Sequence, residues 1–139
     1  MPDLLDDMAE FLVANNIGTL GDDQADWPIF LDRLLDSPDQ FIALYEAPGP
    51  SVTQVFGPGL PVLQTVELNV AVRAASSPPG KQKAKDIWRL LAAVLDQTIN
   101  GTRYTEITPV QANPFLRNRD DRGRPVYACN FHATKELTP

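Results

Sequence analysis

The chain has 139 residues and a mass of 15.3 kDa, and its 43% hydrophobic and 22% charged residues are ordinary values for a globular protein. This length predicts a single domain over residues 1–139 with a core of its own. The net charge of −6 argues against sequence-independent binding to DNA, and apolar runs far shorter than about 18 residues exclude a membrane span.

The charge is unevenly distributed along the sequence. Residues 1–40 hold ten acidic residues against Arg33 alone, whereas the remainder holds eleven basic and eight acidic residues. Such an asymmetry can align neighbouring subunits head to tail. A solvated acidic surface that keeps the protein in solution is the alternative interpretation.

The single cysteine, Cys129, cannot form an internal disulfide, and no signal peptide precedes the acidic start of the sequence. Both features fit synthesis in a reducing cytoplasm.

A first helix is predicted over residues 3–16. Its apolar residues follow the 3.6-residue period and share one face: Leu4, Leu5, Met8, Phe11 and Leu12. Asp3 is the expected N-cap, and we expect Asp6, Asp7 and Glu10 on the opposite face. A helix this short needs a partner surface, which predicts that it docks on a sheet.

Two short strands follow at residues 28–33 and 40–46, and then a long loop rich in glycine and proline from Ala47 to Pro61. Loops of this length inside compact domains are usually functional or mobile. This one carries four apolar residues that form the first part of our candidate interface: Val52, Val55, Phe56 and Leu60. The next strand, Val62 to Ala74, has near-strict alternation and so one buried face.

The second helix is predicted over residues 81–96, after a stop at Ser76 to Gly80. Its apolar face comprises Ala84, Ile87, Trp88, Leu91, Val94 and Leu95. The Asn100-Gly101 pair then predicts a hairpin with a type I′ turn. A strand at 102–111, a loop from Asn113 to Pro125 and a last strand at 126–133 complete the chain.

This order predicts an α+β fold, with two helices packed on one face of a sheet of about five strands. The sheet is expected to be mainly antiparallel, or mixed if the second helix forms a crossover between parallel strands.

The sequence contains no recognisable catalytic or cofactor-binding set. Cys129 and His132 lie three residues apart on a predicted strand, which places their side chains on opposite faces and disfavours a nucleophile–base pair. One cysteine and one histidine cannot form a structural zinc site. We therefore expect no catalytic residues, no metal and no cofactor.

Two partial motifs fail for physical reasons. Gly80-Lys81 lacks the earlier glycine and the following Ser or Thr of a phosphate-binding loop. The loop at residues 118–123 resembles a calcium loop, but Arg122 occupies a ligand position and Cys129 replaces the bidentate glutamate.

Four arginines near the end of the chain form the second part of the candidate interface: Arg117, Arg119, Arg122 and Arg124. A solvated hairpin tip is the simplest interpretation of this cluster. A contact with an acidic neighbour, such as the 1–40 surface of an adjacent subunit, is the alternative.

Taken in order, several segments resemble the minor capsid or tail terminator proteins of long-tailed bacteriophages. The segments are Asp3-Leu4-Leu5 through Leu20-Gly21, Ile29 to Arg33, Ser37-Pro38-Asp39, Ile42 to Glu46, the Gly/Pro loop, Ile99 to Tyr104, and Gly123-Arg124-Pro125 with its following strand. The segment from Asp22 to Pro28 and the Arg117–Arg124 loop depart from the pattern of that family.

The resemblance implies a virion protein of the tail or neck, synthesised in the bacterial host cytoplasm. It implies a homo-oligomeric, hexameric ring that caps the completed tail tube and contacts both the tail tube protein and the head–tail connector protein. DNA would pass through the ring lumen without sequence-specific binding. The alternatives are a non-viral oligomeric binding adaptor and a small hydrolase whose site is shared between chains.

Overall fold

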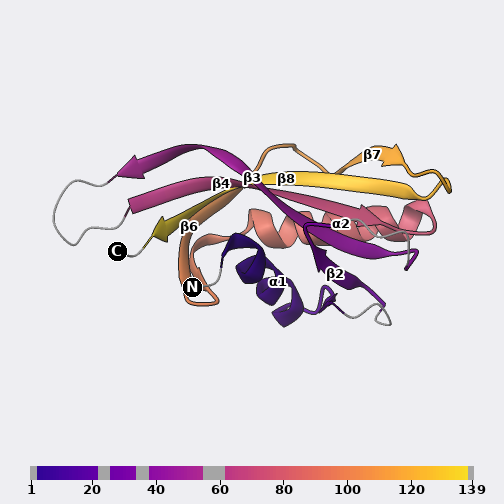
Figure 1. Cartoon of the computed structure of the whole chain (residues 1–139), viewed down its shortest axis with the longest axis horizontal. Helices are drawn as coiled ribbons and strands as arrows, with labels where there is room; N and C mark the ends of the chain where they lie inside the picture. Colours follow the sequence, from indigo (N-terminus) through magenta and orange to yellow (C-terminus); the bar gives the residue numbers. More distant parts are fainter. Residues whose placement is uncertain (1–2, 22–25, 34–37, 55–61, 138–139) are drawn as a thin grey trace.

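The computed structural model describes residues 3–21, 26–33, 38–54 and 62–137. It contains two helices and eight strands, which confirms the α+β class (Figure 1). The elements are α1 (Leu4–Ala14), β1 (Thr19–Leu20), β2 (Pro28–Leu31), β3 (Phe41–Gln54), β4 (Val62–Arg73), α2 (Ser77–Ala92), β5 (Leu95–Ile99), β6 (Thr102–Pro109), β7 (Phe115–Arg119) and β8 (Pro125–Leu137). The prediction of about five strands is therefore wrong.

The eight strands form one mixed sheet in the order β1-β2-β3-β4-β8-β6-β5, and β7 pairs with β8 beside this path. The pairs β1–β2 and β2–β3 are parallel, and all other pairs are antiparallel. The mixed character does not come from a crossover through α2, because that helix leads from β4 to β5, which are not neighbours.

Helix α1 begins with a capping box. The side chain of Asp3 accepts from the backbone N–H of Asp6, and the side chain of Asp6 accepts from the backbone N–H of Asp3. The predicted apolar face is buried, but the expected exposure of Asp7 is wrong. This carboxylate is wholly buried because Tyr104 and Asn100 both donate hydrogen bonds to it.

Helix α2 begins and ends four residues earlier than predicted. Proline fits in a first helical turn, where its missing N–H would have no intrahelical partner, so the helix starts at Ser77 and includes Pro78 and Pro79. It ends at Ala92 because the residues after it pair with β6 as β5. Leu95 consequently lies 74% exposed on an edge strand instead of on the apolar face of the helix.

The predicted turn between β5 and β6 is confirmed. Ile99 pairs with Thr102, and the two residues between them have positive φ angles, 50° at Asn100 and 84° at Gly101. Positive φ at both central residues defines a type I′ turn.

One core cluster joins both helices to the sheet. Figure 1 shows the helices on the same side, with α1 against β1, β3 and β5 and α2 against β4, β6 and β8. The predicted packing on one face is met in part, because the sheet curls and each helix covers a different part of it. Trp88 packs against this core but is only partly buried. Its Nε1 donates a hydrogen bond to the carbonyl of Gln111 at 3.0 Å.

Residues 47–54 correct the predicted loop. They continue β3, and Ala47 pairs with Glu67 while Gln54 pairs with Val62. The proline–glycine segment is accommodated by a register shift between Ala47 and Ser51, so these residues bend the strand without ending it. Residues 55–61 lie outside the described part of the chain.

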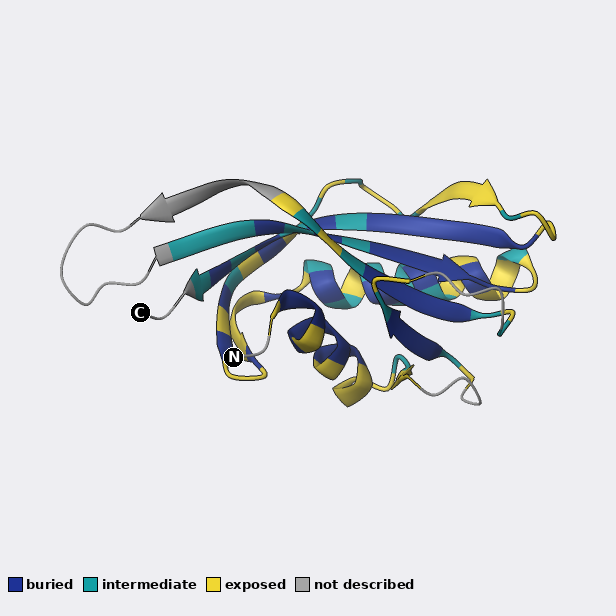
Figure 2. Cartoon of the chain, viewed as in Figure 1, coloured by how far each residue is buried: buried dark blue, intermediate teal, exposed yellow. Residues whose placement is uncertain are grey.

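Strand β7 was not predicted, and it lies within the segment from Asn113 to Pro125 that we expected to be a loop. It pairs with the first half of β8, whose other edge pairs with β4 along its length. All five residues of β7 are exposed, whereas most of β8 is buried (Figure 2).

Candidate functional site

The candidate interface arginines fall on and after β7. Arg117 and Arg119 are exposed residues of that strand, and Arg122 is exposed in the turn that follows. Arg117 Nε donates to the side-chain oxygen of Asn118 at 3.2 Å, and an Arg119 guanidinium nitrogen donates to the carbonyl of Gly123 at 3.1 Å. Both acceptors are neutral groups.

Arg124 differs from the other three because it is buried within an ion-pair cluster. Its guanidinium contacts Asp120 at 2.8 Å and Asp39 at 2.9 Å. Arg73, also buried, lies 3.4 Å from Asp120 and donates to the carbonyl of Pro38 at 2.8 Å. The cluster therefore ties the β7–β8 turn to the end of β4 and to the segment before β3.

The carboxylate of Asp120 is the centre of this cluster. Desolvation acts to raise its pKa, but hydrogen bonds from Arg124 and Arg122 and the charge of Arg124 outweigh it, so the pKa is lowered. Asp120 also accepts from the backbone N–H groups of Arg122 and Arg124, at 3.1 and 2.9 Å, which closes the turn. The cluster holds β7 in place along the sheet.

A groove of about 640 Å³ lies beside β7 on the face of the sheet that the helices leave open. Two small residues on its floor, Ala71 and Ala128, are paired neighbours on β4 and β8. Tyr45 and β7's Phe115 and Arg117 also line the groove. Because the side chains of Ala71 and Ala128 are short, a side chain from another molecule can enter the groove at this pair.

The burial of Tyr45 beside this groove raises the pKa of its hydroxyl. The nearby charge of Arg117 opposes that shift, and the charge of Asp32 adds to it. The tyrosine therefore stays a neutral donor at physiological pH, next to a permanent positive charge.

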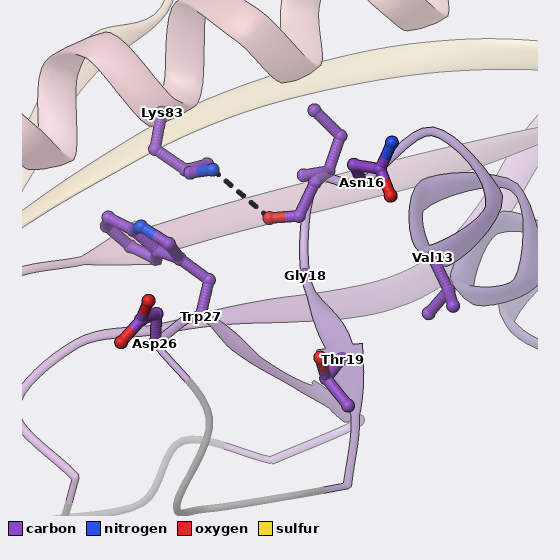
Figure 3. A pocket seen from close by; sticks show the side chains of 8 residues that line it. Val13, Asn16, Gly18, Thr19, Asp26, Trp27 and Lys83 are labelled. Carbon is purple, nitrogen blue, oxygen red and sulfur yellow. Dashed lines mark hydrogen bonds between the residues drawn. The ribbon is translucent and has the colours of Figure 1, made fainter.

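A second groove, of about 560 Å³, lies between the end of α1, β1 and α2 (Figure 3). Lys83 donates from Nζ to the carbonyl of Ile17 at 3.1 Å, and its Nζ lies 5.2 Å from the ring centroid of Trp27. Burial lowers the pKa of Lys83, and the charge of Asp86 acts in the opposite direction. Val13 and Asp26 form part of the lining, so this groove borders the exposed face of α1.

Cys129 and His132 lie on opposite faces of β8, as their spacing predicted. Cys129 is wholly buried in the core, and burial raises its pKa to about 12. His132 points to the other face, where its Nε2 lies 3.9 Å from a carboxylate oxygen of Glu67. Among residues 3–21, 26–33, 38–54 and 62–137, no group of three or more His, Cys, Asp or Glu side chains could hold a metal ion.

Of the four apolar interface candidates, only Val52 lies within the described residues. The backbone of Val52 lies in β3, paired with Gln64. Val55, Phe56 and Leu60 lie outside the described residues. Their proposed contacts stay predictions.

Sequence reasoning missed two exposed apolar residues of β7. Phe115 is 39% exposed and Leu116 is 47% exposed. The sequence did contain a signal for this strand. Residues 115–119 lie between Pro114 and the turn at Asp120 to Arg124, and an apolar strand follows Pro125, which together is typical of a hairpin. The arginine cluster instead favoured the interpretation of this segment as a solvated hairpin tip.

No curated protein matches the chain. A solved chain described as "Virion of native gene transfer agent (GTA) particle" shares the fold, with a TM-score of 0.50, 17% sequence identity and 78% of each chain covered. None of the helices in the described ranges is long and apolar enough to cross a membrane.

The sequence pattern that defines the bacteriophage tail terminator protein family matches residues 11–137. The chain belongs to this family. It is therefore a structural protein of the bacteriophage virion, located in the tail or neck, and the predicted resemblance and location are confirmed.

Proposed function

We propose that this protein, acting as one domain, closes into a hexameric ring that caps the completed tail tube and presents its other side to the head–tail connector protein. The observation that carries the proposal is the family match over residues 11–137, because a tail terminator is by its description the component at which a tail ends. DNA passes through the ring lumen without sequence-specific contact, and the net charge of −6 argues against sequence-independent binding as well.

Open strand edges support an assembling protein. Strand β3 pairs with β2 only from Ile42 to Leu44, so its edge from Tyr45 to Gln54 has no partner among the described strands. Strand β7 pairs with β8 on one side, and β5 ends the sheet. Open edges offer backbone donors and acceptors to other chains.

The two parts of the candidate interface have separate roles in this proposal. Val52, Val55, Phe56 and Leu60, at and beyond the end of β3, contact the tail tube or a neighbouring subunit. Arg117, Arg119 and Arg122 contact an acidic surface of a neighbouring subunit.

The experiment is to assemble tails in the presence and absence of this chain and to image them by negative-stain electron microscopy. With the chain, we expect a ring at one end of each tube and attachment to heads. Without it, tubes should lack the ring and stay separate from heads. Tubes that acquire heads normally without the chain would contradict the proposal.

A further inference from the structure

We propose that an acidic face on α1 of one subunit docks on a basic face formed by β7 of the next subunit. The acidic face is defined as Asp6, Glu10, Val13 and Asp26. The basic face is defined as the open edge of β7, with the side chains of Phe115, Leu116, Arg117 and Arg119 on its two sides. This inference rests on the ring of the proposed function and assigns the two surfaces that hold it together.

The acidic face is the solvent side of α1. Asp6, Glu10 and Val13 follow one another at helical spacing, while the other side of the helix is buried in the core. Val13 is 40% exposed, so this face offers an apolar side chain next to its carboxylates. Asp26 lines the same groove as Val13 and adds a further exposed carboxylate (Figure 3).

The basic face carries charge that the fold itself does not neutralise. Arg73, Arg103 and Arg124 each contact a carboxylate within 3.4 Å. Arg117 and Arg119, in contrast, contact an amide oxygen and a backbone carbonyl, and no carboxylate of the described segments pairs with either. Their guanidinium groups are therefore available to carboxylates from another molecule.

Apolar side chains accompany the charges on both faces. Phe115 and Arg117 line the groove, which has room for a side chain such as Val13. Leu116, the residue between them, points to the other side of the strand and lies exposed at its open edge. Aromatic residues and arginines together are typical of protein interfaces, whereas phosphate binding would not use the apolar groups. The pairing of acid with base and of apolar with apolar identifies a second copy of this chain as the occupant.

The placement of the two faces suits a ring. Figure 1 shows α1 below the sheet and β7 above it, on opposite sides of the domain. Two different faces that complement each other give a heterologous contact, which repeats from one subunit to the next. Neither face can pair with itself, because like charges would meet.

Charge reversal of each face tests this pairing. One variant carries Arg117→Glu and Arg119→Glu on the basic face. The other carries Glu10→Lys and Asp26→Lys on the acidic face and leaves Asp6, which closes the capping box, unchanged. Ring formation, free or on purified tail tubes, is followed by native mass spectrometry, and circular dichroism checks that each variant is folded.

Each variant alone should need a concentration about tenfold or more above that of the wild type to form rings, because like charges then face each other. An equal mixture of the two should restore rings that contain equal numbers of both variants, because each reversed face meets a reversed partner. The control matched to the basic-face variant is Lys81→Glu with Arg89→Glu on the exposed side of α2. It makes the same change in net charge as that variant and should assemble as the wild type does.

The outcomes separate this inference from the proposed function. Variants that form rings at wild-type concentrations would refute the two faces and leave the ring intact. Folded variants that fail alone and also fail when mixed would show that these faces contact the tail tube or DNA, which overturns the inference. A wild-type chain that forms no ring, free or on tubes, would refute the proposed function itself.

Discussion

The hydroxyl of Tyr104 donates a 2.6 Å hydrogen bond to a carboxylate oxygen of Asp7, and both residues are wholly buried. The side-chain amide of Asn100 donates to the other oxygen of Asp7 at 3.2 Å. This network joins α1 to the β5–β6 hairpin across the core. Burial raises the pKa of Tyr104 far above its ordinary value, and the bond to Asp7 raises it further, so the hydroxyl remains a donor at physiological pH.

Replacing Tyr104 with phenylalanine should lower the free energy of unfolding by about 1–3 kcal/mol, because the carboxylate of Asp7 would lose a buried donor. Urea denaturation measures the change. The control is Tyr45→Phe. The hydroxyl of Tyr45 makes no hydrogen bond among the described residues, so its removal should change the free energy of unfolding by less than about 0.5 kcal/mol. Equal effects of the two substitutions would mean that the network contributes nothing.

Asp120→Asn should destabilise the protein in a pH-dependent way. The pKa of Asp120 is lowered in the folded state, so its charge stabilises the fold above the unfolded pKa of about 3.9 and the contribution is lost as pH falls through the folded pKa. The melting temperatures of wild type and variant should therefore differ near neutral pH and converge as the pH falls through the lowered pKa of Asp120 in the folded state. Asp121→Asn, an exposed neighbour, should show no such gap, and a gap that persists in acid would contradict the explanation.

The thiol of Cys129 should resist alkylation in the native protein. Its pKa is raised to about 12 by burial, so thiolate is scarce at mildly alkaline pH and the sulfur is inaccessible. Iodoacetamide should label the protein only after denaturation, as read by mass spectrometry. Rapid labelling under native conditions would show that the core opens around β8.

The segment from 55 to 61 can be tested without removing paired residues. Gln54 and Val62 are paired, so an Asn-Gly turn in place of residues 55–61 connects them in register. We expect a folded protein that no longer completes tails, because the predicted contacts of Val55, Phe56 and Leu60 are lost. A folded variant that completes tails normally would remove these residues from the interface.

Elements with strong local signals were predictable from the sequence. The N-cap at Asp3 and the periodic apolar face defined α1, the alternation defined β4, and the Asn100-Gly101 pair defined the β5–β6 turn. In each case, the local preference and the tertiary fold agree.

The errors arose where pairing partners decide the structure. Residues 47–54 read as a loop because of Pro48 and Pro50, but β4 holds them in a strand. Residues 93–96 continue a helical pattern, yet pairing with β6 and the end of α2 at Ala92 convert part of them to strand. Asp7 was predicted to be exposed because its hydrogen-bond donors, Asn100 and Tyr104, are more than 90 positions away and leave no local signal in the sequence.

The candidate site was only partly predictable for the same reason. The sequence identified the four arginines but could not separate Arg124, whose carboxylate partners include Asp39 from a distant segment. Exposure of Phe115 and Leu116 likewise depends on the place of β7 at an open edge, where it pairs only with β8 among the described strands.

The position of β8 in the sheet has a consequence for how the protein is made. This strand pairs with β4, β6 and β7, and so joins parts of the sheet that have no other direct strand pairing to one another. The ribosome synthesises it after the other strands, so a nascent chain cannot close its sheet or fix β7 in place until then. A chain that is cut short before β8 would therefore lack the assembled basic face, and incomplete products would be left out of the virion.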